Sequence, residues 1–369
     1  MRPKPIAYFL CIATLALIAA CPLMLMSSRH EAVQAAPYKG ILKLWHITEW
    51  RTGGSSFESF LNGRIKAFEA SYAYAFIELE SLTAEEASEA LAAGETPDLI
   101  SYPYGYNPGV DLANLPAVST VIHPAGENAY PYACGGYCVL VNTDLLTQQN
   151  AETPESGWGI RPEALINAAA FGAAFDAETG CCALPALALH EFPESDEPSY
   201  SAWGDPDPPD ALLSLAPQAL SDGLEAFLKG ETAVLIASQR QLYEATKAFM
   251  AGDGPQFFAY AIGGYTDMVQ MIGVTDSDDK KKLSACTTFA QGLLSGSAQR
   301  KLETLGVLPV VADLEMYDED ECRRTMYALV CQSAALPPAT EAQELDILAA
   351  RAAGGDKAAL RTLRSRLGG

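Results

Sequence analysis

Basic residues are scarce in this sequence: 24 Lys and Arg stand against 46 Asp and Glu, which gives a formal net charge of -22. A protein that binds nucleic acid neutralises phosphates with clustered Lys and Arg. The charge therefore argues against DNA or RNA as a partner. Acidity of this degree suits a soluble protein that works outside the cell or on a surface, although solubility alone would also account for it.

The motifs of common enzyme classes are also missing. The sequence has no G-x-S-x-G elbow, no H-E-x-x-H, no P-loop and no Rossmann glycine fingerprint. Its four histidines lie far apart and no C-x-x-C occurs, so no metal-ligand spacing is present. We therefore expect no cofactor and no metal, and a binding protein rather than an enzyme.

What is present fits a globular protein of two lobes. The chain has 369 residues, of which 49% are hydrophobic and 19% charged. This length suffices for two compact lobes, each with its own core.

The N-terminus predicts export. Arg2 and Lys4 precede an apolar run, Pro5–Met26, as in a signal segment. Within this run, Ile18–Cys21 resembles a lipobox, in which Cys21 would be lipidated. The residues after Cys21 are apolar, unlike those of most lipoproteins, so two alternatives stay open. The run is close to the ~20 residues of a membrane anchor, and cleavage after Ala35 is the third possibility.

Cysteine gives no complete disulfide framework. Of nine cysteines, Cys11 and Cys21 belong to the leader, which leaves an odd number, seven. In an extended strand, Cys134 and Cys138 would lie roughly 13 Å apart, too far for a disulfide, whose Cα atoms lie within ~7 Å. Buried cysteines that act as small hydrophobes are the default expectation.

Strands and helices alternate after the leader. Apolar runs predict strands at 40–47, 75–82 and 98–102. A helix is expected after Gly53-Gly54-Ser55-Ser56, and a capping box at Thr83 predicts another. This order is typical of a parallel sheet, whose ligands bind beyond the carboxyl ends of the strands. Those ends carry Trp45, His46, Tyr102 and Tyr104.

The stretch AYPYACGGYCVLVNTDLL, residues 129–146, combines tyrosines, a glycine pair, two cysteines and an apolar run. It could hold a redox or metal site, or mark a crossing between two lobes beside a ligand. Further along, 233–237 predicts a buried strand followed by a helix from about Ser238, and the Pro- and Asp-rich segment 191–210 predicts a surface loop.

Several segments, in this order, resemble the extracellular solute-binding proteins of bacterial ABC importers, the family that includes maltose-type sugar binders. The segments are RIKAFEA, AFIELESL, AGETPDLI, AYPYACGGYCVLVNTDLL, AFLKGETAVLIASQRQL, TTFAQGLLSGSAQRKLETLGVLPV and RAAGGDKAALRTLRSRL. No single segment is diagnostic, but together they cover nearly the whole chain after the leader.

The resemblance implies an α/β, two-lobe periplasmic-binding-protein-like fold of type II, in which each lobe is a sheet flanked by helices and the ligand cleft lies between them. Residues 1–36 would be the leader or anchor. The N-terminal lobe would comprise 38–134 and 265–309, and the C-terminal lobe 135–264 and 310–369. The stretch around Gly135-Gly136 would be the first of three crossings, with AYAIGGYTDMV and LGVLPVV as the others.

The resemblance also implies a function. The protein would capture a small solute, most simply a carbohydrate, and deliver it to ABC permease subunits as a monomer anchored outside the cytoplasmic membrane. A ligand-sensing lipoprotein without a transport role and a transferase on a similar fold are the alternatives.

Aromatic platforms and polar edges are the expected ligand contacts. The candidates are Trp45, His46, Ser55, Ser56, Tyr102, Tyr132, Tyr137, Trp203, Arg240 and Tyr265. Sugar-binding relatives place an aromatic platform near Arg240, so an anionic or amino-bearing ligand also stays open.

Overall fold

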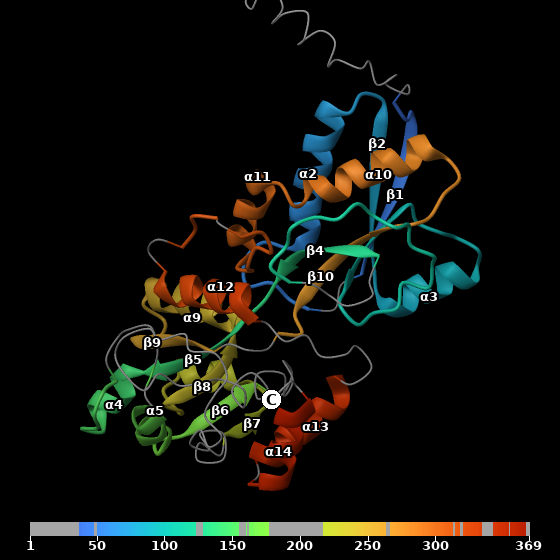
Figure 1. Cartoon of the computed structure of the whole chain (residues 1–369). Helices are drawn as coiled ribbons and strands as arrows, with labels where there is room; N and C mark the ends of the chain where they lie inside the picture. The colour runs from blue at the N-terminus through green and yellow to red at the C-terminus, as the bar shows by residue number, and fades with distance from the viewer. Residues whose placement is uncertain are drawn as a thin grey trace, which may run out of the picture.

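Two sheets, each flanked by helices, form two lobes of an elongated molecule (Figure 1). This computed structural model describes residues 37–47, 50–122, 128–154, 160, 162–176, 217–262, 266–312, 314–317, 320–333, 342–353 and 355–366. The predicted leader, the loop 191–210, Trp203 and Tyr265 lie outside the described residues.

The first lobe has the strand order β2-β1-β3-β10-β4. Strand β1 pairs in parallel with β2 and β3, and β10 runs antiparallel to β3 and β4. The strands are β1 (Gly40–Ile47), β2 (Ala75–Leu82), β3 (Leu99–Pro103), β4 (Ala129–Cys134) and β10 (Val269–Val274). The helices are α2 (Phe57–Ser71), α3 (Ala84–Ala92), α10 (Lys280–Gly292), α11 (Gly296–Gln299) and the 3-10 turn η1 (Arg300–Leu305).

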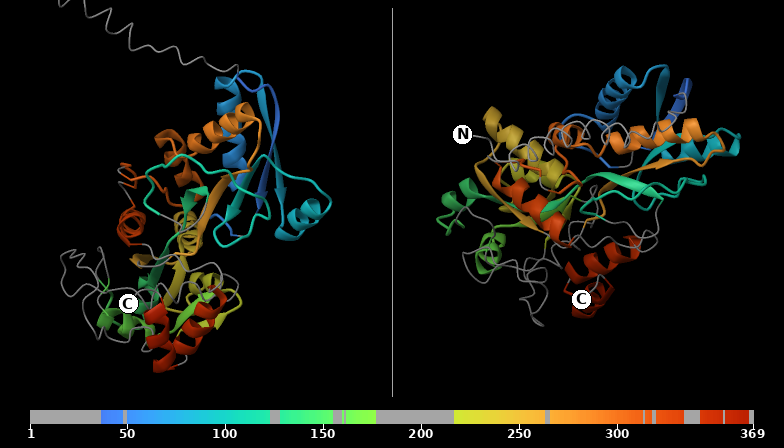
Figure 2. Two further views of the ribbon diagram at one scale, coloured as in Figure 1. Left: turned by 45° about the vertical axis from the view of Figure 1, so that its right-hand side comes forward. Right: turned by 45° about the horizontal axis from the view of Figure 1, so that its top comes forward.

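The second lobe has the order β7-β6-β8-β5-β9. Its strands are β5 (Tyr137–Asn142), β6 (Ala173–Asp176), β7 (Gln218–Leu220), β8 (Val234–Ser238) and β9 (Phe257–Ile262). Its helices are α4 (Thr143–Gln148), α5 (Pro162–Ala169), α8 (Gly223–Leu228), α9 (Gln239–Ala251), α13 (Ala342–Ala353) and α14 (Lys357–Arg366). Helix α12 (Glu321–Ser333) lies at the junction of the lobes, near α9 (Figures 1 and 2).

Local sequence signals account for several of these boundaries. The predicted capping box is confirmed, because the Thr83 hydroxyl accepts from the backbone N–H of Glu86 and the Glu86 carboxylate accepts from the N–H of Thr83. The change from β5 to α4 is marked by Asn142, whose side-chain oxygen accepts from the backbone N–H of Leu145. Such caps satisfy N–H groups that have no partner inside the helix.

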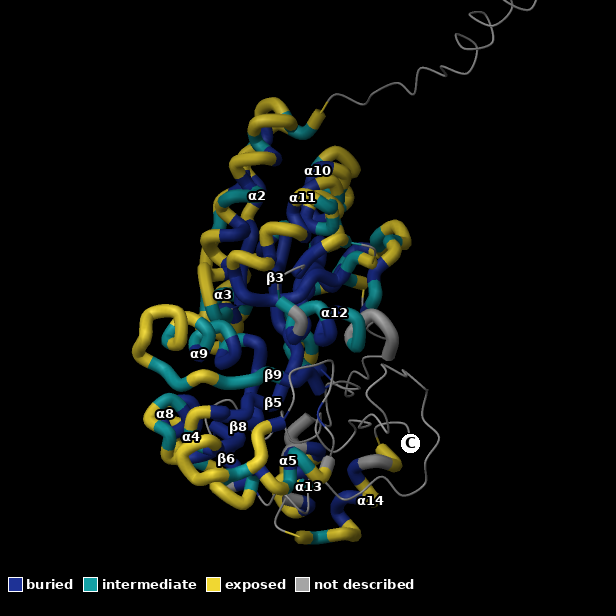
Figure 3. The backbone as a smooth tube through the Cα atoms, turned by 90° about the vertical axis from the view of Figure 1, so that its left-hand side faces the viewer, coloured by how far each residue is buried: buried dark blue, intermediate teal, exposed yellow. Residues whose placement is uncertain are grey.

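Burial follows the strands through both lobes, while the outer faces of the helices are exposed (Figure 3). One apolar cluster crosses the junction: it contains Trp45 and Tyr102 from the first lobe and Leu140 and Leu235 from the second. The lobe limits expected from the sequence stay predictions. The two sheets themselves divide the chain so that 137–262 supplies every strand of the second.

Candidate functional site

Three chain segments cross between the lobes, and they are hydrogen-bonded to one another. Cys134 of the first crossing exchanges two backbone bonds with Leu308 of the third, at 3.0 and 2.7 Å. The N–H of Gly135 donates to the Met268 carbonyl of the second crossing at 2.7 Å. The Thr266 hydroxyl donates to the carbonyl of Gly135 at 3.0 Å. The crossings therefore form one connected hinge rather than three independent strands.

The glycine pair is needed here for close approach. A Cβ atom on Gly135 would lie 2.8 Å from Cβ of Met268 and 2.9 Å from Oε1 of Gln239. A Cβ atom on Gly136 would lie 3.1 Å from the sulfur of Met326 in α12. The hinge backbone thus packs directly against the second crossing, α9 and α12, which a larger residue would prevent.

Gln239, the first residue of α9, joins this helix to the hinge. Its Oε1 accepts from the N–H of Gly136 at 3.1 Å, and its own N–H donates to the Gly136 carbonyl at 2.9 Å. The residue is fully buried, yet its Nε2 has no hydrogen-bond partner among the described residues. An unpaired buried donor is costly, so the start of α9 carries a polar group whose hydrogen bond is not satisfied by the described residues.

Arg240 follows on the same helix turn and is held close to the junction. Its side chain is 17% exposed and lies 3.8 Å from the carboxylate of Glu244. The Nε of Arg240 has no hydrogen-bond partner in the part of the chain that the structure describes. The carbonyl of Arg240 lies 3.1 Å from where a Cβ on Gly53 would be, so α9 contacts the loop after β1.

This loop, residues 50–56, is fixed on two sides. The N–H groups of Gly54 and Ser55 donate to the carbonyls of Leu305 and Thr304, at 2.9 and 3.0 Å. Ser56 caps α2 by accepting from the N–H of Ser59 at 3.1 Å. The structure therefore brings the predicted Ser55 and Ser56 to the same side of the junction as the predicted Arg240.

Tyr243, one turn after Arg240, fills the contact between loop and helix. Its side chain lies against Gly53, Gly54 and Gly306, where added Cβ atoms would approach it to 2.7, 3.3 and 3.2 Å. The guanidinium of Arg323 in α12 lies 5.4 Å from the centre of its ring, a cation–π distance. Sequence reasoning missed Tyr243, although its place one turn from Arg240 on the same helix was a usable signal.

The predicted residues of the first sheet lie below the surface. Trp45, His46, Tyr102 and Tyr132 are 1%, 2%, 0% and 0% exposed. Their rings have no accessible face in this structure. Trp45 packs in the apolar cluster that crosses the junction, and its Nε1 has no partner among the described residues.

His46 and Tyr132 belong to a buried polar network centred on Ser101. The Ser101 hydroxyl lies 3.0 Å from Nδ1 of His46 and 2.9 Å from the hydroxyl of Tyr132. Nε2 of Gln270 donates to the same oxygen at 3.1 Å. Burial lowers the pKa of His46 to about 4, and burial raises the pKa of Tyr132 above its ordinary value. At neutral pH the network is therefore uncharged.

Tyr137 lies at the hinge, almost buried, and its hydroxyl donates to the Asp267 carboxylate at 2.5 Å. Trp50, in the loop after β1, is half-buried and makes an edge contact with Phe57 at 5.0 Å. Its Nε1 has no hydrogen-bond partner among the residues that the structure describes. Trp50 therefore has accessible surface, which the four buried residues of the first sheet lack.

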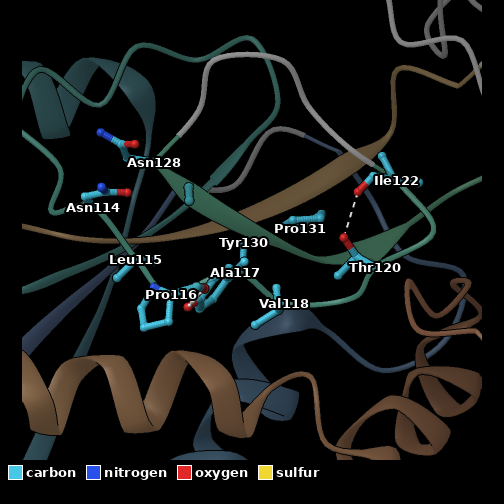
Figure 4. A pocket seen from close by; sticks show the side chains of 11 residues that line it. Asn114, Leu115, Pro116, Ala117, Val118, Thr120, Ile122, Asn128, Tyr130 and Pro131 are labelled. Atoms are coloured by element: carbon cyan, nitrogen blue, oxygen red, sulfur yellow. Dashed lines mark hydrogen bonds between the residues drawn. The ribbon is translucent and has the colours of Figure 1, made fainter.

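A pocket of about 200 Å³ lies in the first lobe (Figure 4). It is lined by the segment 114–122 and the start of β4, where the Tyr130 hydroxyl donates to the Pro116 carbonyl at 2.6 Å. The residues that line it are all uncharged. We therefore place the candidate site at the hinge, where Gln239 and Arg240 each have an unpaired donor among the described residues.

The described part of the chain contains no cluster of His, Cys, Asp and Glu that could hold a metal ion. None of its helices combines the length and apolar character needed to cross a membrane.

Comparison with known proteins gives matches at the level of structure alone. No protein-family model and no curated protein sequence matches the chain. Among solved structures, a cyclic α-maltosyl-1,6-maltose binding protein from Arthrobacter globiformis matches with a TM-score of 0.62 at 14% identity, over 89% of this chain and 98% of that one.

Two further structures are similar. A cyclo/maltodextrin-binding protein complexed with maltotetraose has a TM-score of 0.60 at 13% identity, over 90% and 98% of the two chains. The maltose-maltodextrin binding protein of Alicyclobacillus acidocaldarius has a TM-score of 0.55 at 12% identity, over 89% and 100%. The predicted fold class is confirmed: the chain has the two-lobe, α/β fold of these binding proteins.

Proposed function

We propose that the protein captures a carbohydrate between its lobes and passes it to the permease of an ABC importer. The observation that carries this proposal is the fold match, which spans almost the full length of relatives named as maltodextrin or cyclic glucan binders. The proposal includes no catalysis, so the bound solute leaves chemically unchanged.

The chemistry of the junction supports a ligand rich in oxygen acceptors. The polar atoms of Gln239, Arg240 and Trp50 that have no partner among the described residues are all N–H donors. Sugar hydroxyls accept such hydrogen bonds, and Trp50 has exposed ring surface on which a sugar could stack. In this proposal Arg240, Trp50, Ser55 and Ser56 contact the ligand. The buried residues Gln239, Trp45, Tyr102 and Tyr132 support the site from beneath.

A thermal-shift screen tests the ligand class. Linear and cyclic maltodextrins, other sugars, polyols, amines and organic acids would each be added in excess to the purified protein. A true ligand stabilises the folded state by RT ln(1 + [L]/Kd), about 2.7 kcal/mol at a hundredfold excess over Kd. Stabilisation by no carbohydrate but by an organic acid or amine would overturn the sugar assignment.

Calorimetry on Arg240→Ala then tests the site. We expect affinity to fall by about tenfold or more, as for the loss of a buried charged contact. Lys247→Ala is the matched control, because Lys247 is an exposed residue of the same helix. Equal affinity of both variants would place the ligand elsewhere. Small-angle scattering with saturating ligand should also show a smaller radius of gyration, because the lobes close.

We further propose that the protein is exported and held at the cell surface through Cys21. The basic residues Arg2 and Lys4 and the apolar run after them support this. Metabolic labelling with a fatty-acid probe should mark the protein, and Cys21→Ala should abolish the label. A label that persists in Cys21→Ala would reject lipidation at this residue.

A further inference from the structure

Two buried cysteines face each other where α12 packs on the second sheet. Cys138 is in β5, just after the glycine hinge, and Cys322 is in the first turn of α12. They are 0% and 8% exposed and belong to the same apolar cluster. The two cysteines are 184 positions apart in the sequence, so no local pattern indicated that they are neighbours. They come together because the chain returns through the third crossing and places α12 against β5.

One contact fixes the helix on the strand: Met326 of α12 lies against Gly136, and its sulfur is 3.1 Å from where a Cβ would be. Cys138 is two residues from Gly136, on the same face of the extended chain and about 7 Å along it. Cys322 is four residues from Met326, on the same helix face and about 6 Å along the axis. The two steps are of similar length, so Cys322 comes over Cys138 where the helix runs opposite to the strand, and the contact between the two thiols shows that it does.

The side chains show the same proximity. The two thiols share a hydrogen bond, which together with burial raises the pKa of Cys322 well above its ordinary value. Cys134, which points to the same face, is occupied elsewhere: its thiol donates to the carbonyls of Leu308 and Pro309 at 3.7 and 3.6 Å. Cys286 lies in α10 of the first lobe and is buried there.

We propose that Cys138 and Cys322 are joined by a disulfide in the exported protein. The inference rests on the proposed export, because structural disulfides persist in oxidising compartments. The oxidant is an exchangeable disulfide, carried by a thiol–disulfide oxidoreductase or a small thiol compound. A thiolate of the pair attacks it, and the second thiolate then displaces the donor thiol. Two protein thiols and one donor disulfide give one protein disulfide and two donor thiols.

The bond forms before α12 is fully packed. In the folded protein both thiols are buried, and a raised pKa keeps Cys322 protonated and unreactive at neutral pH. Once formed, the bond fastens α12 to the strand that leaves the hinge. Because α12 also contacts the third crossing, where the Tyr327 hydroxyl donates to the Val311 carbonyl, the bond would fix one side of the hinge covalently.

Peptide mapping of the full chain tests the bond directly. The protein would be recovered from the membrane fraction of an expressing bacterium, with open thiols alkylated at lysis, and digested with pepsin at low pH. We expect a linked pair of peptides containing Cys138 and Cys322 that separates on reduction. Recovery of both cysteines in alkylated form would overturn the proposal.

Thermal unfolding provides a second readout. A reductant should lower the melting temperature of the wild type by roughly 5 °C or more, from the usual worth of a native disulfide in a domain of this size. Cys138→Ala and Cys322→Ala should each abolish this shift, whereas Cys286→Ala should retain it. An equal shift in Cys322→Ala would assign it to another pair and reject the bond. Neither measurement needs a ligand. Absence of the disulfide would therefore not contradict the proposed ligand capture, and absence of ligand binding would not contradict the disulfide.

Discussion

The two sheets of the molecule have the same plan. In each, three parallel strands are followed by a strand that runs antiparallel to them, and then by a fifth strand antiparallel to the fourth. The two sheets differ in the side chains of the residues that pair across their central strands. In the first, His46 pairs with Ser101, and Gln270 donates to the same serine. In the second, Phe175, Ile236 and Val139 lie in one row and are all apolar.

This difference shows that the strand order itself does not require buried polar residues in the central strands. In the second lobe, Phe175, Ile236 and Val139 fill the corresponding place by apolar packing, as protein interiors usually do. A buried polar network is costly unless every member is satisfied, so its place in the first lobe calls for a separate reason. The network lies directly beneath the end of β1, where the loop that faces α9 begins, and it fixes the side chains that support this loop.

The largest expected effect comes from the apolar row. Ile236→Ala should destabilise the second lobe by about 4 kcal/mol, because it removes buried methylene groups and leaves a cavity. The loss should be the same from pH 7 to pH 5, because Tyr260 beside Val139 is the titratable side chain of this row and burial raises its pKa further above that range. Denaturant unfolding at several pH values measures it. If the free energy of unfolding lost in Ile236→Ala changes with pH, the contrast between an apolar second lobe and a pH-sensitive first lobe is wrong.

The next effect concerns the polar row of the first lobe. The pKa of His46 is about 4 in the folded protein against 6.5 ordinarily. Between these values the unfolded chain binds a proton that the folded chain does not, so stability falls as pH falls from 6.5 to 4. The contribution is about 3 kcal/mol over this window. Below pH 4 no further loss arises from this residue.

His46→Asn separates this contribution from that of the many carboxylates. The Asn amide occupies nearly the place of Nδ1 but does not titrate, so the difference between wild type and variant isolates the imidazole. Trp45 and Trp50 both lie in the first lobe, so fluorescence in a Trp158→Phe, Trp203→Phe background reports on that lobe. Parallel pH profiles for wild type and His46→Asn would contradict the assignment.

The smallest effect should come from Ser101→Ala. It removes the oxygen shared by His46, Tyr132 and Gln270, and unpaired buried groups should cost about 2 kcal/mol. Ser59→Ala, at an exposed position of α2, is the control and should change stability by less than about 0.5 kcal/mol. If Ser101→Ala changes the free energy of unfolding as little as Ser59→Ala does, the network does not stabilise the protein.

Local features could be read from the sequence because their causes are local. The capping box at Thr83 and the cap at Asn142 depend on residues within three positions. The hinge stretch around Gly135 was also predicted, from the resemblance and its glycine pair. The accessibility of Trp45 could not be read in this way: a residue near the end of a buried strand is exposed only if nothing from another segment covers it.

The unpredicted contacts of the site are all long-range. Gln239 binds Gly136 from 103 positions away, and Tyr243 packs on glycines from two distant loops. The helix period places Tyr243 beside Arg240, but the partners of Gln239 and Tyr243 depend on how the hinge places the two lobes. Arg240 was predicted only because relatives place a ligand contact near this position, and its role stays a proposal.

The position of β10 sets the order in which the two sheets can be completed as the chain becomes available from its N-terminus. This strand lies between β3 and β4, yet it follows every strand of the second sheet in the sequence. Until residue 274 is available, β3 and β4 each lack a neighbour and cannot be joined. The sheet that begins later in the chain is therefore the first that can close. A chain that is threaded N-terminus first keeps its leading lobe open until nearly three-quarters of its length has arrived, which favours passage through a narrow channel in an unfolded state.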